Sequence, residues 1–422
     1  MTTSRSAESI SVASFWRWRV EKEGPTIATS ETTRVRPGPP DAVILTLIVM
    51  LVTVGLLAVY SASFALGSLQ YGSPYYFVAR QAMWAVVGAG ALVFMMRFDY
   101  HRLRAMSPLL MFGALVGLTA VLAPGIGVNH NGASRWIAMG PLPPVQPSEF
   151  AKLALIIYVS AWLSGKSRNL RSFAAGLVPF VVMVGLVAGL VMLEPDMGTT
   201  IIIVLTTLTL FFVAGGALSH LFALTSIGGV TAAFLVVTGG YRMDRIFAFV
   251  SPDADPSGKG FHILQLLIAL GSGGVTGLGI GASRQKFFYV PGAHTDGIFA
   301  IIGEEMGFIG AMAVILLFAL LIYRGIRIML NAPDNFGSLL ALGITSWIAY
   351  QAVINIGGIT RTMPLTGIPL PFLSYGGSAL AATLAAVGIL LNISRYSKGR
   401  APARERRPVA KVTKRRLREE GT

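Results

Sequence analysis

Apolar stretches about 20 residues long recur along most of this 422-residue sequence. A helix needs about 20 apolar residues to cross roughly 30 Å of hydrocarbon, and a helix in a soluble domain is seldom apolar on every side for so long. Charged residues make up only 13% of the chain, about half the share found in an ordinary soluble domain. We therefore predict an all-α integral membrane protein.

Ten membrane spans are predicted, with basic residues concentrated on one side of the membrane. The spans are 42–65, 77–96, 106–124, 149–164, 173–193, 199–217, 220–239, 298–323, 337–358 and 375–394. Both tails are basic, and basic clusters follow spans two, four and eight; the clusters are Arg97, Arg102 and Arg104, then Lys166, Arg168 and Arg171, then Arg324 and Arg327. Because Lys and Arg are enriched in cytoplasmic loops, both termini are predicted to be cytoplasmic.

Three regions follow from this pattern. Residues 1–40 are predicted to be a disordered cytoplasmic tail, 41–395 the ten-helix membrane domain, and 396–422 a basic cytoplasmic tail. Residues 395–422 hold 11 Lys or Arg and 3 Glu, and so supply +8 of the net charge of +15. Such a run can bind nucleic acid, but beside a membrane domain it favours the anionic lipid surface. The absence of cysteine excludes disulfides, thiolate metal sites and a cysteine nucleophile.

Two connections on the outer side are long, at about 125–148 and 240–297. Loops longer than about 15 residues are usually functional or disordered. The second is the large extracytoplasmic loop between spans seven and eight. Its segment 261–280 is apolar and glycine-rich but too short and interrupted to span. We predict that this segment is re-entrant or interfacial and buried against protein.

Charged residues near the hydrocarbon are costly, so each is a candidate for function. Glu149 and Lys152 lie three apart on one face of a helix that begins after Pro147. They form either a structural ion pair on a capped helix or a polar surface facing a cavity. In the second case Arg135 and Lys152 are available to bind phosphates.

Two further groups of charged residues flank the later spans. The turn Glu194-Pro195-Asp196 is predicted to cap a helix, because Asp side chains accept hydrogen bonds from free backbone N–H groups. Arg242 and Arg245 either clamp a pyrophosphate or form surface ion pairs. The glycine run at 271–281 does not follow a β-strand, so a nucleotide-binding loop is excluded by context and the glycines serve close backbone approach.

Asp296 lies where the large outer loop enters span eight, beside His294 and eight residues before Glu304. A carboxylate there that is partly removed from water can act as a base near neutral pH. The alternative is that Thr295 or Asp296 merely caps the helix. Arg361, in the proline-rich loop before the last span, either binds an anion or ties down that loop. No spacing of His, Asp and Glu predicts a zinc site, although a divalent cation held by one or two carboxylates and substrate phosphates fits the sequence.

At these motifs the chain resembles the shape, elongation, division and sporulation family, which includes FtsW, RodA and SpoVE. The motifs that carry the resemblance occur in order, and they are residues 131–137, 146–152, 195–199, 241–245, 271–274, 285–286, 294–296, 303–307 and 369–378. Residues 245–253 and 271–274 look more like FtsW than RodA. Two positions depart from the family pattern: Gly292, where Glu is frequent, and Gly297, where an aromatic residue is frequent.

The resemblance implies a peptidoglycan glycosyltransferase of the bacterial cytoplasmic membrane that polymerises lipid II on the outer leaflet, by inverting displacement of undecaprenyl pyrophosphate. Asp296 matches the family's essential aspartate, and is expected to be the general base and a ligand of Mg²⁺ or Mn²⁺. The residues expected to bind substrate are Arg135, Trp136, Glu149, Lys152, Arg242, Arg245, Gln285, Lys286, His294 and Arg361.

The expected partners are lipid II, the nascent glycan strand, a class B penicillin-binding protein that crosslinks strands, other division proteins of the membrane, and membrane lipids, but not nucleic acid. Two other functions remain open at this point. A lipid II flippase would use the same cations along a polar pathway through the bilayer. A non-catalytic division scaffold would tolerate loss of Asp296.

Overall fold

The computed structural model describes residues 37–130, 133–140, 142–165 and 170–397. Most of both predicted tails therefore lies outside the described residues, as do Asn131, Lys166 and Arg168. The described ends lie side by side, because the Gly38 N–H donates to the Arg395 carbonyl at 2.8 Å and Arg395 Nε donates to the Gly38 carbonyl at 3.1 Å.

Each of the ten predicted spans is a helix, which confirms the all-α membrane fold. The helices are α2 (Ala42–Tyr71), α3 (Tyr76–Arg97), α4 (Tyr100–Leu122), α5 (Pro147–Gly165), α6 (Val178–Leu193, after a π-helical turn at Phe173–Leu177), α7 (Met197–Val213), α8 (Leu218–Thr238), α11 (Ile298–Asn331), α12 (Asn335–Ile359) and α13 (Gly377–Arg395). Within the described chain, eight of them are long and apolar enough to cross a membrane. The other two are α5, which carries Glu149 and Lys152, and α7, which has 17 residues.

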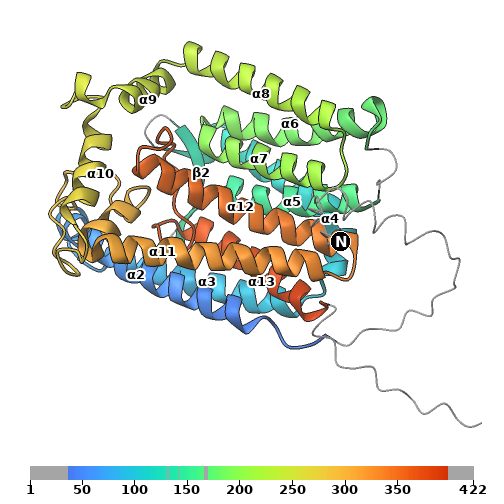
Figure 1. Cartoon of the computed structure of the whole chain (residues 1–422), viewed down its shortest axis with the longest axis horizontal. Coiled ribbons are helices and arrows are strands. Elements are labelled where there is room, and N and C mark those ends of the chain that lie inside the picture. Colours follow the sequence, from blue (N-terminus) through green and yellow to red (C-terminus); the bar gives the residue numbers. More distant parts are fainter. Residues whose placement is uncertain (1–36, 131–132, 141, 166–169, 398–422) are drawn as a thin grey trace, which may run out of the picture.

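The helices run alongside one another (Figure 1), and α12 and α13 are the most buried of the candidate spans. Of the most apolar stretch of each, 78% and 83% of the residues are buried, whereas none of the described residues of α8 is buried. Small residues allow α13 to approach α3 closely, since a Cβ atom at Gly388 would lie 2.5 Å from the Leu92 carbonyl oxygen. The core is therefore built on α12 and α13, with α8 at the periphery.

The outer connections contain structure that the sequence analysis did not predict. The first forms an antiparallel sheet of three short strands in the order β1 (Gly127–His130), β2 (Ala133–Met139) and β3 (Leu142–Val145). The second contains α9 (Gly240–Val250), a 3₁₀ turn (Pro252–Ala254) and α10 (Phe261–Ser272). Figure 1 shows α9, α10 and β2 gathered at one end of the bundle.

The prediction that 261–280 is buried against protein is confirmed for α10. This helix packs against α11 and buries Ile263, Leu266 and Ala269. Helix α10 has only 12 residues, so it is too short to cross the membrane.

Helix α11 is broken at Gly307, where φ is 67° and ψ is −166°. The glycine-rich segment after α10 inserts at this break through four backbone hydrogen bonds: Leu278 N–H to Glu304 O, Gly279 N–H to Glu305 O, Phe308 N–H to Gly274 O and Ile309 N–H to Val275 O. A side chain at Gly307 would place its Cβ atom 2.5 Å from the Val275 carbonyl oxygen. The glycines therefore serve the close backbone approach that was predicted for them.

Candidate active site

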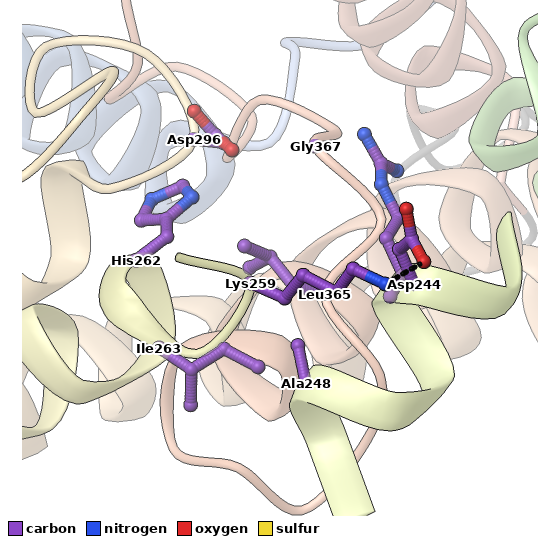
Figure 2. A pocket seen from close by; sticks show the side chains of 9 residues that line it. Asp244, Ala248, Lys259, His262, Ile263, Asp296, Leu365 and Gly367 are labelled. Atoms are coloured by element: carbon purple, nitrogen blue, oxygen red, sulfur yellow. Dashed lines mark ion pairs between the residues drawn. The ribbon is translucent and has the colours of Figure 1, made fainter. Parts of the chain in front are cut away.

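A pocket of about 260 Å³ opens among the outer segments (Figure 2). Four parts of the chain contribute to it: α9, the start of α10 with the residues before it, the turn before α11, and the loop between α12 and α13. The lining residues are Asp244, Arg245, Ala248, Lys259, His262, Ile263, Asp296, Leu365 and Gly367. Apolar and charged side chains thus share one cavity, with Asp296 and His262 on one side and the residues of α9 on the other.

Asp296 is held by the tight turn that precedes α11. Thr295 Oγ1 donates a hydrogen bond to Asp296 Oδ1 at 3.0 Å, and Asn355 Nδ2 of α12 donates to the Asp296 backbone carbonyl at 3.0 Å. Gly292 has φ 65°, and a Cβ atom there would lie 2.5 Å from Asp296 Oδ1. Gly297 occupies the N-cap position of α11, where no side chain donates or accepts a capping bond. The alternative in which Thr295 or Asp296 caps the helix is therefore wrong.

Positive charge faces Asp296 from α9 and from the residues before α10. The Cβ position of Gly367 lies 3.6 Å from an Arg245 Nη atom and 3.8 Å from Asp296 Oδ2, so both groups approach this glycine. Arg245 Nη1 donates to the Thr366 carbonyl at 2.9 Å. Lys259 pairs with Asp244 at 2.7 Å, and this hydrogen bond raises the pKa of the lysine. The pocket therefore holds two cations and two carboxylates, and one of the carboxylates, Asp244, is already paired with Lys259.

His262, Lys259 and Asp244 line the pocket but were not among the predicted substrate-binding residues. Burial lowers the pKa of His262, and the nearby Arg245 guanidinium acts in the same direction, while the Asp296 carboxylate and the Pro291 carbonyl oppose it. The sequence offered one signal for His262, a lone histidine at the start of a short apolar helix. Such a residue is ordinarily part of the packing, and only the fold brings it beside Asp296.

Glu149 and Lys152 are each only 2% exposed and line no part of this pocket. Lys152 Nζ lies 2.9 Å from Glu149 Oε1 and donates to Gln351 Oε1 at 3.3 Å. Gln351 Nε2 in turn donates to the Pro369 carbonyl at 2.9 Å. The pair therefore supports the loop between α12 and α13, two residues of which, Leu365 and Gly367, line the pocket.

Arg135 and Trp136 lie half-buried on β2. Arg135 Nε donates to the Glu194 carbonyl at 2.9 Å and its Nη2 donates to the Pro195 carbonyl, so this arginine anchors the sheet to the turn between α6 and α7. Burial, together with the charge of Asp196, raises the pKa of the Glu194 carboxyl to about 8. Asp196 is the N-cap of α7 and accepts from the Thr199 N–H at 3.0 Å, which confirms the predicted capping turn.

Lys286 and Gln285 lie at the break in α11, away from the pocket. Lys286 Nζ pairs with Glu305 Oε1 at 2.9 Å, and Ser61 Oγ of α2 donates to the same oxygen at 2.6 Å. The Gln285 N–H donates to Glu304 Oε1 at 3.4 Å. Glu304, which was predicted to follow Asp296 down the helix, is thus a buried acceptor for backbone N–H groups rather than part of the pocket.

The remaining predicted residues also make structural contacts. Arg242 Nη1 donates to the Leu235 carbonyl at 3.2 Å. His294 packs against the rings of Phe77 and Tyr375, and burial lowers its pKa to about 4. Arg361 donates to the last carbonyls of α9, with Nε 3.1 Å from the Phe249 oxygen, which matches the predicted tie for the loop. Of the predicted site residues, the structure brings Asp296 and Arg245 together in the pocket.

Among the residues that the structure describes, no three His, Asp or Glu side chains gather in a way that could hold a metal ion. Asp296 can offer Oδ2, because Oδ1 already accepts from Thr295. A divalent cation at Asp296 would therefore need most of its oxygen ligands from a bound substrate, which is how Mg²⁺ commonly binds with phosphates.

The apolar helices, with a charged pocket at one end of the bundle, define a polytopic membrane protein. The sequence profile of the FtsW/RodA/SpoVE family, described as "Cell cycle protein", matches residues 41–399. The chain belongs to this family. It is 46% identical over 359 residues to stage V sporulation protein E of Bacillus subtilis, covering 85% of this chain and 98% of that protein.

A second relative is named probable peptidoglycan glycosyltransferase FtsW, from Trichlorobacter lovleyi. It is 42% identical, over 84% of this chain and 93% of its own. Among solved structures, RodA of Thermus thermophilus aligns with a TM-score of 0.64 and 27% identity, over 85% of this chain and 98% of that one. A chain from a structure described as a peptidoglycan synthase complex that coordinates polymerization and crosslinking aligns with a TM-score of 0.69 and 26% identity, over 84% and 98%.

Proposed function

We propose that this chain is a peptidoglycan glycosyltransferase of the FtsW type, which polymerises lipid II into glycan strands during cell division. The observation that carries the proposal is the pocket that brings Asp296 together with Arg245 and Lys259. A polymerase needs a base for the attacking hydroxyl and cations for the leaving pyrophosphate, and these three residues supply both. The names of the relatives support the same activity.

The chemistry assigns one role to each side of the pocket. The donor is the growing strand, whose anomeric carbon is α-linked to undecaprenyl pyrophosphate, and the acceptor is the 4-hydroxyl of the terminal N-acetylglucosamine of lipid II. Asp296 takes the proton of that hydroxyl as the oxygen attacks the anomeric carbon from the opposite face. The bond to the pyrophosphate breaks in the same step, which gives the β-linkage by a single inversion.

Arg245 and Lys259 are assigned to the pyrophosphate. Arg245 Nη1 donates to the Thr366 carbonyl. The rest of the guanidinium is exposed and can donate two parallel hydrogen bonds to phosphate oxygens. Lys259 is exposed and can exchange Asp244 for a phosphate. Asp296 would hold a divalent cation, Mg²⁺ or Mn²⁺, together with oxygens of the substrate, and the cation would supply further positive charge for the leaving group.

We infer the orientation in the membrane from α11. Its part after the break at Gly307, residues 308–331, has 24 residues and corresponds to a length of about 36 Å, enough to cross the hydrocarbon, so Asp296 and the basic end at Arg324 and Arg327 belong to opposite faces of a bilayer. We place the basic end and both termini in the cytoplasm and the pocket at the outer face of the bacterial cytoplasmic membrane. The partner would be a class B penicillin-binding protein, in line with the complex to which the chain is structurally similar.

The test is polymerisation of labelled lipid II by the purified chain with its transpeptidase partner, comparing wild type with Asp296→Asn. Removing the base should lower the rate by at least about a hundredfold. Asp253→Asn is the matched control, because Asp253 is an exposed carboxylate of the same outer segment that does not line the pocket.

The alternatives predict different results. A flippase would move labelled lipid II across a vesicle membrane without making glycan. A scaffold would support growth equally well in cells that carry Asp296→Asn. The pocket lies among the outer segments at one end of the bundle, which favours the polymerase over a pathway through the bilayer. Equal polymerisation by wild type and Asp296→Asn would remove Asp296 as the base.

A further inference from the structure

Two hydrogen-bond acceptors lie on the same side of the pocket, and the proposed function uses only one of them. Asp296 is the proposed base. His262, in the first turn of α10, lies beside it on that side of the cavity (Figure 2). His262 Nε2 is buried and has no hydrogen-bond partner within the described part of the chain. A buried polar atom without a partner costs free energy unless a ligand or water satisfies it.

The surroundings of His262 favour a neutral ring that accepts at Nε2. Burial disfavours the imidazolium form. Because the Pro291 carbonyl acts on the ring as a hydrogen-bond acceptor and Nε2 has no partner within the described residues, we assign the ring proton to Nδ1. That tautomer leaves the Nε2 lone pair free to accept. Because Pro291 belongs to the turn that carries Asp296, the same contact fixes the imidazole relative to the carboxylate.

A carboxylate and a neutral imidazole side by side match two adjacent hydroxyl groups on a sugar. The terminal N-acetylglucosamine of lipid II presents such a pair, the 4-hydroxyl that attacks and the 3-hydroxyl beside it. The opposite side of the pocket carries Arg245 and Lys259, which are donors and suit phosphate rather than a hydroxyl proton. The two hydroxyl groups therefore find hydrogen-bond acceptors on the side of Asp296 and His262.

We propose that His262 recognises the acceptor sugar, with Nε2 accepting a hydrogen bond from its 3-hydroxyl while Asp296 takes the proton from its 4-hydroxyl. This inference rests on the proposed function, and adds to it a residue that selects the acceptor. No bond to His262 forms or breaks. The histidine orients the sugar so that the 4-hydroxyl points at the anomeric carbon of the donor.

The experiment measures a single coupling, so that the acceptor can be changed without changing the donor. The donor is a labelled lipid II whose own 4-hydroxyl is methylated, and the acceptor is either lipid II or its analogue with hydrogen in place of the 3-hydroxyl. Wild type, His262→Phe and His262→Gln are compared in complex with the transpeptidase. His220→Phe, a histidine of α8 outside the pocket, is the matched control and should behave as wild type.

We expect wild type to couple the 3-deoxy acceptor roughly tenfold more slowly than lipid II, which corresponds to one lost hydrogen bond. His262→Phe should be roughly tenfold slower with lipid II and should no longer distinguish the two acceptors. His262→Gln keeps an acceptor atom near the position of Nε2 and should retain the preference for lipid II. If the phenylalanine variant does not fold, the same ratio measured with His262→Ala decides.

A purely structural histidine gives another pattern. In that case His262→Phe would be slow but would still prefer lipid II by the wild-type factor, and the inference would be overturned while the polymerase stands. Failure of wild type to couple lipid II at all would instead overturn the proposed function, and the inference with it.

Discussion

Lys286 offers a sharp test of the difference between a charge that binds substrate and a charge that holds the fold. Its side chain is 1% exposed and its Nζ lies 2.9 Å from Glu305 Oε1. Replacing it by methionine in Lys286→Met keeps the length of the side chain but leaves Glu305 buried with Ser61 as its remaining side-chain donor. Removing one partner of a buried ion pair typically costs 3–5 kcal/mol, so we expect a loss of about 4 kcal/mol in the free energy of unfolding.

The second variant in this test is Lys286→Met combined with Glu305→Gln. Without the carboxylate no unpaired charge is buried, and the amide can still accept from Ser61, so most of the lost stability should return. Thermal unfolding of the detergent-solubilised protein, followed by tryptophan fluorescence, measures both variants against wild type. Polymerisation of lipid II per folded molecule is measured on the same samples.

The two roles separate in the double variant. If Lys286 only holds the outer segment to α11, the stable double variant should polymerise at close to the wild-type rate. A double variant that unfolds like wild type yet makes no glycan would refute this reasoning, and would indicate that Lys286 binds the substrate. Lys259→Met is the contrasting change: its ion pair is about half exposed to solvent, so stability should change little while polymerisation falls.

Three further predictions concern the backbone, the turn and the metal. Gly307→Ala should destabilise the protein by about 3 kcal/mol or more, because neither the dihedral angles at this position nor the space around it admit a Cβ atom. Gly90→Ala is the control and should not destabilise, because no atom lies within 4 Å of its Cβ position. Equal unfolding temperatures of the two variants would contradict the break in α11. The raised pKa of Glu194 means that the folded state holds this proton more tightly than the unfolded state does. The stabilising contribution of the protonated carboxyl is therefore complete below pH 4.5 and is lost as the pH rises through about 8. Glu194→Gln should lack that decline, and parallel curves of stability against pH for wild type and variant would contradict this. Chelation by EDTA should abolish polymerisation and added Mn²⁺ or Mg²⁺ should restore it, while full activity in EDTA would exclude a cation at Asp296.

The spans were predictable because apolar length is a local property of the sequence. The outer segments were not predicted in the same detail. Helix α9 has 11 residues and the three strands have four to seven, so none is long enough to produce a clear period against its surroundings. Their form depends on what they pack against, and that information lies in distant parts of the chain.

Part of the site could be predicted from where a residue stands along the chain. Asp296 stands at the junction of a loop and a span, and the prediction that it lies in a polar site agrees with the pocket. Lys152 and Lys286 were assigned to substrate from the family resemblance, and for Lys152 the sequence also left open a structural pair with Glu149. Their partners include Gln351, which is 199 residues from Lys152, and Ser61, which is 225 residues from Lys286. His262 was missed for the converse reason, since it resembles a packing residue until Asp296 is placed beside it.

The buried polar residues that line no cavity still determine the geometry of the reaction, because the loop between α12 and α13 contacts both sides of the pocket. Gln351 and Asn355 of α12 donate to the carbonyls of Pro369 and Ile368, and Asn355 also donates to the carbonyl of Asp296. The same loop receives Arg245 from α9. Helix α9 follows α8, which buries none of its described residues, so the bundle fixes α9 mainly through this loop. The separation between the proposed base and the cations for the leaving group is therefore set in the core of the bundle. A change at Lys152 that frees Gln351 should accordingly lower the rate without touching the substrate.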